Sequence, residues 1–163
     1  MSTLDDVLTE TVPVAGRVTA FAADTKDRLA AYGMADGTIW LTERGGKASK
    51  LVGHLSQVTK MHFDGNRLYS SSYDGKLLFW MTADPQIKPI TLFQTGSWLT
   101  DFAFTTDKEY IWTGEHSGKV TEYLISLEKI AQRLRQNVRR DFTQEEWDYY
   151  IGKGIPMRQL TKE

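Results

Sequence analysis

Apolar and other residues alternate along three six-residue segments that recur at a nearly constant spacing. The segments are Val18–Ala23, Val58–Phe63 and Leu99–Phe104, so corresponding positions lie 40 and then 41 residues apart. Alternation with a period of two is typical of a β-strand that buries one face. A repeat period of about 40 residues predicts a repeat architecture built from such strands.

Two further strand-like runs follow each of these segments. The second runs are 29–33, 68–72 and 110–114, and the third runs are 38–41, 76–81 and 119–125. The turns between them contain Asp36-Gly37, Asp74-Gly75 and Ser117-Gly118. Glycine favours such hairpin turns because it adopts positive φ at little steric cost. A fourth set of runs lies at 47–52 and 89–94, with 7–12 as its counterpart upstream, which makes about twelve short strands, four per unit.

These units predict an all-β fold of three four-stranded antiparallel propeller blades. The predicted blades cover residues 7–42, 47–81 and 89–125, within a domain of residues 1–125. The alternative is an ordinary antiparallel sandwich. Since closed propellers use about four to eight blades, we expect a partial propeller. A homodimer with a six-bladed ring, or further blades of the same or another chain, would complete it.

Residues 126–163 predict a short helical extension packed on the last blade. Apolar residues recur at helical spacing between 126 and 140, at Leu127, Ile130, Ala131, Leu134 and Val138, and predict an amphipathic helix. A second helix is indicated by Thr143 and Glu146 at capping-box spacing, with Phe142 and Trp147 at the flanking staple positions. Gly152 suits the end of that helix.

The middle unit resembles a WD repeat. Gly53-His54 opens it, Ser70 lies in the second strand, Asp74 in the turn, and Trp80 at the end of the third strand. The resemblance implies that the side chains of His54, Ser70, Asp74 and Trp80 form a structural hydrogen-bonded network within one blade. Such a network is physically sensible because buried polar groups need partners.

The outer units depart from the WD pattern. The first keeps Asp36 but has Thr42 at the Trp position, and the third has Thr113 and Tyr123 at the Ser and Trp positions but Ser117 in place of Asp. Neither has the Gly-His pair. We therefore expect one well-networked blade between two weaker blades.

The run from Arg140 to Gly152, followed by Ile155-Pro156, carries a second resemblance. It is similar to the extreme C-terminus of bacterial multidomain proteins in which WD repeats follow a STAND-type NTPase or a caspase-like protease. The resemblance implies the C-terminal part of a larger bacterial signalling or defence protein, or a free-standing, self-associating relative. The NTPase and protease activities belong to other domains and are not transferred to this chain.

Composition narrows the possible chemistry. The net charge of −1 provides no general attraction to nucleic acid or anionic lipid. The absence of cysteine excludes disulfides and thiolate chemistry, and no apolar run approaches the roughly 20 residues that span a bilayer. We expect a cytoplasmic protein without membrane contact, metal or cofactor.

The predicted function is a non-enzymatic scaffold for protein–protein interaction or ligand sensing. The three alternating segments described first, Val18–Ala23, Val58–Phe63 and Leu99–Phe104, are called the inner strands. Trp98 precedes the third of them, near the rim where propellers bind partners, and His116 lies in a hairpin turn beside Glu115. Trp98 and His116 are candidate partner contacts, since Trp is enriched in binding hot spots; the alternative is that Trp98 fills the gap between neighbouring blade sheets. An enzyme that uses His116, Glu115 and Asp101 at the propeller axis is a further hypothesis.

The alternative function is a nucleic-acid-binding adaptor. Five cations fall on the predicted helix, namely Lys129, Arg133, Arg135, Arg139 and Arg140. Such a group can bind phosphates, with Arg133 and Arg140 as candidate contacts. The simpler interpretation is a solvated helix face whose cations lie favourably near its C-terminal end.

Overall fold

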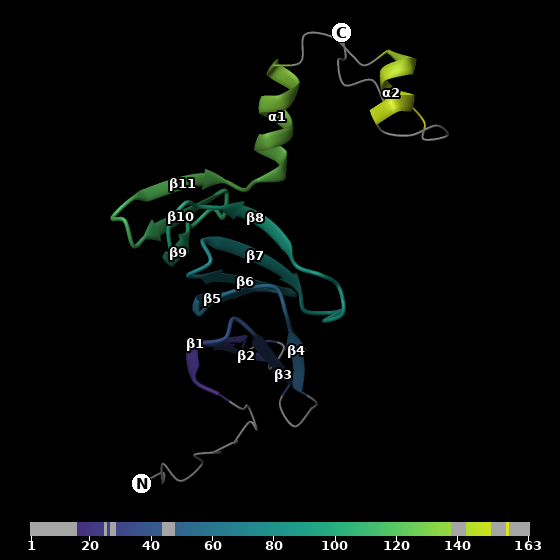
Figure 1. Ribbon diagram of the computed structural model, residues 1–163. Coiled ribbons are helices and arrows are strands. Elements are labelled where there is room, and N and C mark those ends of the chain that lie inside the picture. The colour runs from purple at the N-terminus through teal and green to yellow at the C-terminus, as the bar shows by residue number, and fades with distance from the viewer. Residues whose placement is uncertain are drawn as a thin grey trace, which may run out of the picture. The chain divides into compact units, whose positions relative to one another are not determined.

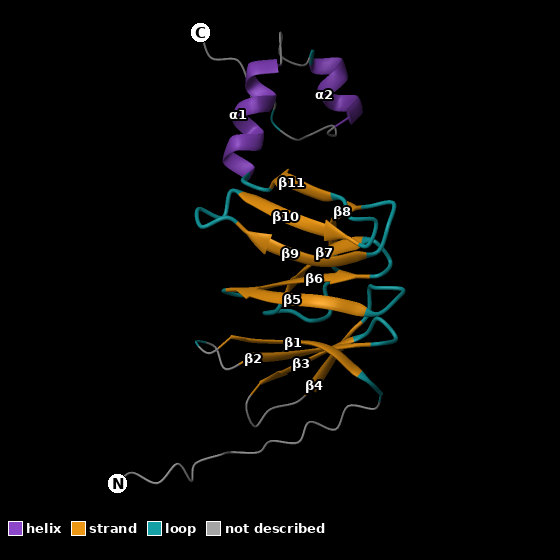
Figure 2. Cartoon of the chain, turned by 90° about the vertical axis from the view of Figure 1, so that its left-hand side faces the viewer, coloured by secondary structure: helices purple, strands orange, loops and turns teal. Residues whose placement is uncertain are grey.

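The computed structural model describes residues 16–24, 26, 29–43, 48–137, 143–150 and 156. Over these residues the protein is mostly β, with eleven strands in three antiparallel sheets followed by two short helices (Figures 1 and 2). The chain divides into two compact units. The first holds the residues up to 103 together with 113–121, and the second holds 104–112 and the residues from 122 onward.

The strands follow one another in each sheet in chain order. Sheet 1 consists of β1 (Val18–Asp24), β2 (Leu29–Met34), β3 (Ile39–Glu43) and β4 (Ala48–Leu51). Sheet 2 consists of β5 (Val58–Asp64), β6 (Arg67–Ser72), β7 (Lys76–Met81) and β8 (Ile90–Gln94). Sheet 3 consists of β9 (Leu99–Phe104), β10 (Tyr110–Glu115) and β11 (Val120–Leu124).

The sheet boundaries differ from the predicted units by one strand. β4 pairs with β3, with Leu51 opposite Ile39, and β8 pairs with β7, with Ile90 opposite Phe79. The fourth strand therefore completes the preceding sheet, whereas the predicted units 47–81 and 89–125 assigned it to the following one. Alternation alone does not reveal which neighbour a short strand pairs with, and this caused the shift. The predicted strand at 7–12 lies outside the described residues.

The three sheets repeat one another in detail. Register shifts occur at the start of the inner strands of sheets 1 and 2, between Val18 and Ala20 and between Val58 and Lys60. The turn glycines have φ values of 87° at Gly37, 78° at Gly75 and 84° at Gly118, which confirms the predicted hairpin turns. Equivalent positions in the sheets can therefore be compared directly.

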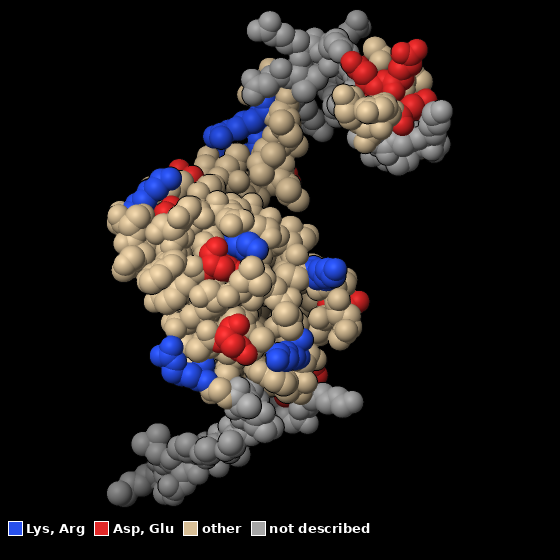
Figure 3. All heavy atoms as spheres, viewed as in Figure 1, with Lys and Arg blue, Asp and Glu red and all other residues tan. Residues whose placement is uncertain are grey.

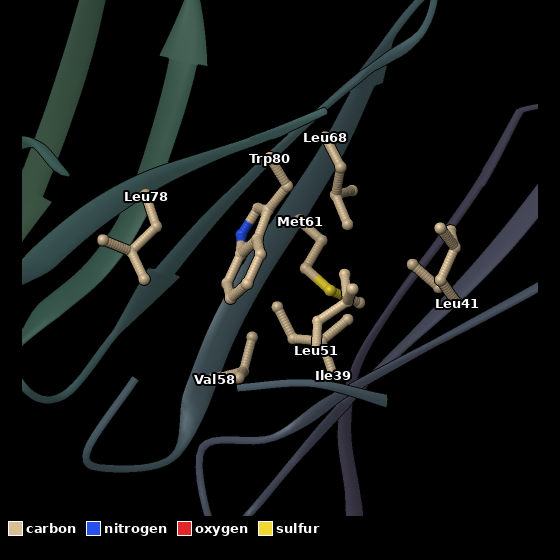
Figure 4. Close-up of a cluster of buried hydrophobic side chains, with 9 residues drawn as sticks. Ile39, Leu41, Leu51, Val58, Met61, Leu68, Leu78 and Trp80 are labelled. Atoms are coloured by element: carbon tan, nitrogen blue, oxygen red, sulfur yellow. The ribbon is translucent and has the colours of Figure 1, made fainter. Parts of the chain in front are cut away.

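Sheets 1 and 2 bury a common hydrophobic core (Figure 4). Buried side chains from both sheets line it, namely Ala31, Ile39, Leu41, Leu51, Val58, Met61, Leu68, Leu78 and Trp80. A polar bond closes one side of this interface, because Thr19 Oγ1 donates to the carbonyl of Val58 at 2.7 Å. Neighbouring sheets are thus joined by apolar packing and by a threonine bond between their inner strands.

The second unit carries both helices, α1 (Leu127–Asn137) and α2 (Gln144–Tyr150). The backbone N–H groups of Ile125 and Ser126 both donate to the carbonyl of Glu109, at 2.9 and 3.1 Å. On the expected apolar stripe, Leu127 and Leu134 are exposed, so these two leucines contribute little packing. Neither described helix is long and apolar enough to cross a membrane.

Candidate functional site

The structure brings His54, Ser70, Asp74 and Trp80 together in sheet 2. His54 Nδ1 lies 3.1 Å from Asp74 Oδ2, and Nε2 lies 2.8 Å from Ser70 Oγ. Trp80 Nε1 donates to the same Ser70 oxygen at 2.8 Å. Because an ionised carboxylate can only accept, Nδ1 donates to Asp74, and Nε2 then accepts the serine hydroxyl. Every polar atom of this chain of bonds has a partner.

Asp74 receives two further donors, the backbone N–H groups of Leu55 and Lys76, both at 2.9 Å. Burial raises the pKa of this carboxyl, but the bonds from His54, Leu55 and Lys76 outweigh it and lower the pKa to about 2. The carboxylate therefore fastens the segment before β5 to the turn between β6 and β7. Since His54, Ser70 and Trp80 are all buried, we assign the network to structure and not to ligand contact.

Acid is expected to weaken this network. The pKa of Asp74 is about 2 in the folded chain and about 3.9 in an unfolded one. A depressed folded pKa contributes stability above pH 4 that is lost as the pH falls towards 2, on the order of 2 kcal/mol. Urea unfolding between pH 7 and 2 should show a steeper acid loss for the wild type than for Asp74→Asn. Asp84→Asn, at an exposed turn, is the matched control, and parallel profiles for wild type and Asp74→Asn would contradict the assignment.

In the other two sheets, the side chains at the position of Asp74 form hydrogen bonds within their own turns. Asp36 Oδ1 accepts the backbone N–H of Thr38 at 2.9 Å and its hydroxyl at 2.7 Å, and Ser117 Oγ donates to Glu115 Oε2. Thr42, at the Trp position of sheet 1, donates to the carbonyl of Ala30. Among the described residues, the four-residue network is thus found in sheet 2 alone.

A second repeated feature lies where each turn meets the start of an inner strand. The residue before the turn donates its backbone N–H to the residue before the inner strand. The three bonds run from Ala35 to Arg17 at 2.9 Å, from Tyr73 to Gln57 at 3.0 Å and from His116 to Trp98 at 2.9 Å. We call these six residues the rim row. The repeat therefore places six side chains of differing chemistry on equivalent backbone positions.

Three aromatic rings of the rim row are in contact, and we call them the aromatic cluster. The ring centroids of Tyr73 and Trp98 are 4.9 Å apart, and those of Trp98 and His116 are 5.1 Å apart. Trp98 remains 51% exposed. Trp98 and His116, both predicted as partner contacts, therefore lie side by side with part of the indole open to solvent.

Tyr73 was not predicted from the sequence. A signal for it exists, because Tyr73 directly precedes the Asp-Gly turn just as His116 directly precedes the Ser-Gly turn. Aligning the turns of the three repeats finds this position.

At the other end of the rim row, Arg17 Nη2 donates to Gln57 Oε1 at 2.9 Å, so that part of the row is polar.

The predicted cationic group on α1 is only partly described. Lys129 forms an ion pair with Glu109, which raises the pKa of the lysine, and it lies over the ring of Tyr110. Arg133 is exposed, whereas Arg139, Arg140 and the side chain of Arg135 lie outside the described residues. On the face shown in Figure 3, the described Lys and Arg side chains lie in separate groups, several of them beside Asp or Glu side chains. Nucleic-acid binding through this helix stays a prediction.

The remaining predicted residues lie outside the aromatic cluster. At the start of α2, Thr143 N donates to Glu146 Oε2 at 3.0 Å and Glu146 N to Thr143 Oγ1 at 3.2 Å, a reciprocal cap. Trp147 is half-buried, and Phe142 lies outside the described residues. Asp101, a candidate for catalysis, pairs with Lys60 at 2.6 Å. No group of three or more described His, Asp or Glu residues is placed to hold a metal ion.

Fold and site together define an all-β protein of repeated antiparallel sheets with an aromatic surface cluster. No protein-family model matches the chain, and no curated protein matches it. Among solved structures, it is similar to the computationally designed Ika8 protein, with 28% sequence identity and a TM-score of 0.58 over 66% of this chain. The match covers 33% of the designed chain, so this chain spans about a third of that protein.

Proposed function

We propose that this chain is a non-enzymatic binding module that holds a protein partner at the aromatic cluster. The observation that carries the proposal is the indole of Trp98, which is 51% exposed yet held between Tyr73 and His116. A large ring that is already ordered loses little conformational entropy when a partner covers it. Trp and Tyr supply much of the binding energy in protein interfaces for this reason.

The buried network of sheet 2 fixes the turn that carries Tyr73, one member of the aromatic cluster. Tyr73 is the neighbour of Asp74, whose carboxylate accepts bonds from His54 and from the backbone of Leu55 and Lys76. The turn that presents Tyr73 is therefore fixed before any partner arrives. We propose that the network and the cluster act together, the first holding the second in its binding geometry.

The fold that we propose is a partial WD-type propeller. Three antiparallel sheets repeat with equivalent turns and equivalent bonds between inner strands, and the sheet 2 network contains the residues that the WD resemblance implies. The C-terminal run resembles that of bacterial multidomain proteins, which supports a role as the cytoplasmic interaction part of a larger signalling or defence protein.

Trp98→Ala is expected to weaken partner binding strongly without unfolding the chain. The probe is a random peptide library displayed on phage and selected against the wild-type chain. Selected peptides should bind Trp98→Ala at least about tenfold more weakly, since a hot-spot aromatic contributes about 2 kcal/mol or more. Its thermal unfolding should stay close to that of the wild type, because the ring is half-exposed.

Trp112→Ala is the matched control, since Trp112 is 45% exposed and lies outside the aromatic cluster. It should leave peptide affinity unchanged. The proposal fails if the selected peptides bind Trp98→Ala as tightly as the wild type, or if Trp112→Ala removes binding to the same extent.

A further inference from the structure

The side of each inner strand that faces the preceding sheet is apolar in all three repeats. Val58 and Met61 in sheet 2, and Leu99 and Phe102 in sheet 3, are at most 5% exposed. The equivalent residues of sheet 1, Val18 and Phe21, are 42% and 59% exposed. We call the surface around Val18 and Phe21 the leading face. It has the composition of a covered interface, but the part of the chain that the structure describes leaves it open.

The opposite end of the first unit shows the complementary pattern. Ile39 in sheet 1 and Leu77 in sheet 2 are fully buried, whereas the equivalent Val120 in sheet 3 is 64% exposed. We call the surface formed by Thr100, Gly118 and Val120 the trailing face. Sheet 3 is the last sheet of the described chain, and its trailing face is open.

The turn glycines show the same difference between sheet 3 and the two sheets before it. A Cβ added at Gly37 would lie 2.8 Å from the carbonyl oxygens of His54 and Ser56, and one added at Gly75 would lie 2.8 Å from that of Thr95. Each of these oxygens belongs to the segment that leads into the following sheet. A Cβ at Gly118 would meet nothing within 4 Å. The turn of sheet 3 is thus shaped like the others but, within the described residues, lacks the neighbour that they have.

A repeated hydrogen bond indicates which group a sheet that follows sheet 3 would contribute. Thr19 Oγ1 donates to the carbonyl of Val58, and Thr59 Oγ1 donates to that of Leu99, each at 2.7 Å. The equivalent Thr100 donates to the carbonyl of Gly114 in its own sheet at 2.8 Å, just as Thr19 also lies 3.2 Å from the carbonyl of Gly33. Within the described residues, Thr100 has no carbonyl of a following sheet beside it. Continuing the repeat, a fourth sheet would place a carbonyl at Thr100, from a residue equivalent to Val18.

We propose that a second copy of this chain docks its leading face on the trailing face. Both open faces belong to one molecule, and the repeat makes each the complement of the other. The contact continues the interface already formed between sheets 1 and 2, with Thr100 Oγ1 donating to Val18 O of the second copy. Because such a head-to-tail contact can close, two copies supply six sheets, within the range of about four to eight for propeller rings.

Sedimentation velocity tests this association. The wild-type chain at micromolar concentration should sediment as a species of twice the 18.6 kDa of one chain. Val120→Lys, which puts a charge on the trailing face, should weaken association about tenfold or more. Val52→Lys is the matched control, since Val52 is 68% exposed and lies on neither face, and it should associate like the wild type.

Mixing two variants tests the head-to-tail geometry. Phe21→Lys damages the leading face and Val120→Lys the trailing face, so each variant alone should associate at least about tenfold more weakly than the wild type. The mixture can form one undamaged contact, between the leading face of Val120→Lys and the trailing face of Phe21→Lys, while the other contact carries both lysines. It should therefore form a 1:1 dimer held by one contact and should associate more tightly than either variant alone. Circular dichroism of each variant confirms that the sheets are retained.

Cross-linking provides a second readout that does not depend on the lysine variants. The chain contains no cysteine, so Val18→Cys mixed with Val120→Cys should cross-link into a heterodimer with a short bismaleimide, and Val18→Cys mixed with Val52→Cys should not. The proposal is overturned by a wild type that is monomeric at about 100 μM, far above the Kd of a stable dimer, by equal effects of Val120→Lys and Val52→Lys, or by the absence of a dimer in the lysine mixture. A monomer would indicate that sheets from elsewhere cover these faces.

Discussion

Trp80→Ala is expected to lower the free energy of unfolding by about 4 kcal/mol, because it removes a large side chain from a packed core. The indole is 2% exposed and lies within the core between sheets 1 and 2. Its removal leaves a cavity and also removes the N–H that Ser70 Oγ accepts at 2.8 Å. Urea unfolding followed by far-ultraviolet circular dichroism measures the loss.

Two companion variants separate these causes. Trp80→Phe keeps most of the ring volume but leaves Ser70 without the indole donor. It should lower the free energy of unfolding by about 1–3 kcal/mol, the cost of leaving a buried polar group without its partner. Trp98→Ala removes the same side chain from a half-exposed position and should change stability by less than about 1 kcal/mol. Equal losses for Trp80→Ala and Trp98→Ala would contradict the core role of Trp80.

Gly75→Ala is expected to destabilise the chain nearly as strongly. Gly75 has a φ of 78°, a region that costs an alanine about 1–2 kcal/mol. The added methyl group would also lie 2.8 Å from the carbonyl oxygen of Thr95 and 3.0 Å from that of Ser97. Because both obstacles are backbone, they cannot rotate away, and the total cost should exceed the conformational term by a further about 1–3 kcal/mol.

Gly118→Ala is the matched control, with a similar φ of 84° but nothing within 4 Å of an added Cβ. It should cost only the about 1–2 kcal/mol of the left-handed conformation when unfolding is measured at nanomolar concentration, below the proposed association. Equal losses in Gly75→Ala and Gly118→Ala would show that contact with the following sheet contributes nothing to the first effect.

Much of the fold could be predicted because strands and turns are local properties. Period-two alternation located the inner strands, and Asp-Gly or Ser-Gly pairs located the turns, all three with positive φ at glycine. The sheet boundaries could not be predicted in this way. Whether residues 48–51 pair with β3 or begin the next sheet depends on the path of the chain between them, which periodicity does not encode.

The candidate site was predicted in part. Trp98 and His116 were identified from their places in the repeat, but the contact between Trp98 and Tyr73 joins the segment before β9 to the turn between β6 and β7. An aromatic cluster of this kind depends on where separate turns meet. No pattern along a single repeat shows which rings will lie next to one another.

The sequence by itself determined the repeat, its strands and its glycine turns, because alternating burial and positive φ are imposed residue by residue. Only the tertiary structure decided which copies of a repeated position are covered. Val18, Val58 and Leu99 are alike in sequence, yet Val58 and Leu99 are fully buried and Val18 is 42% exposed. Burial is a property of neighbouring sheets, and the first and last sheets of the described chain each lack one neighbour.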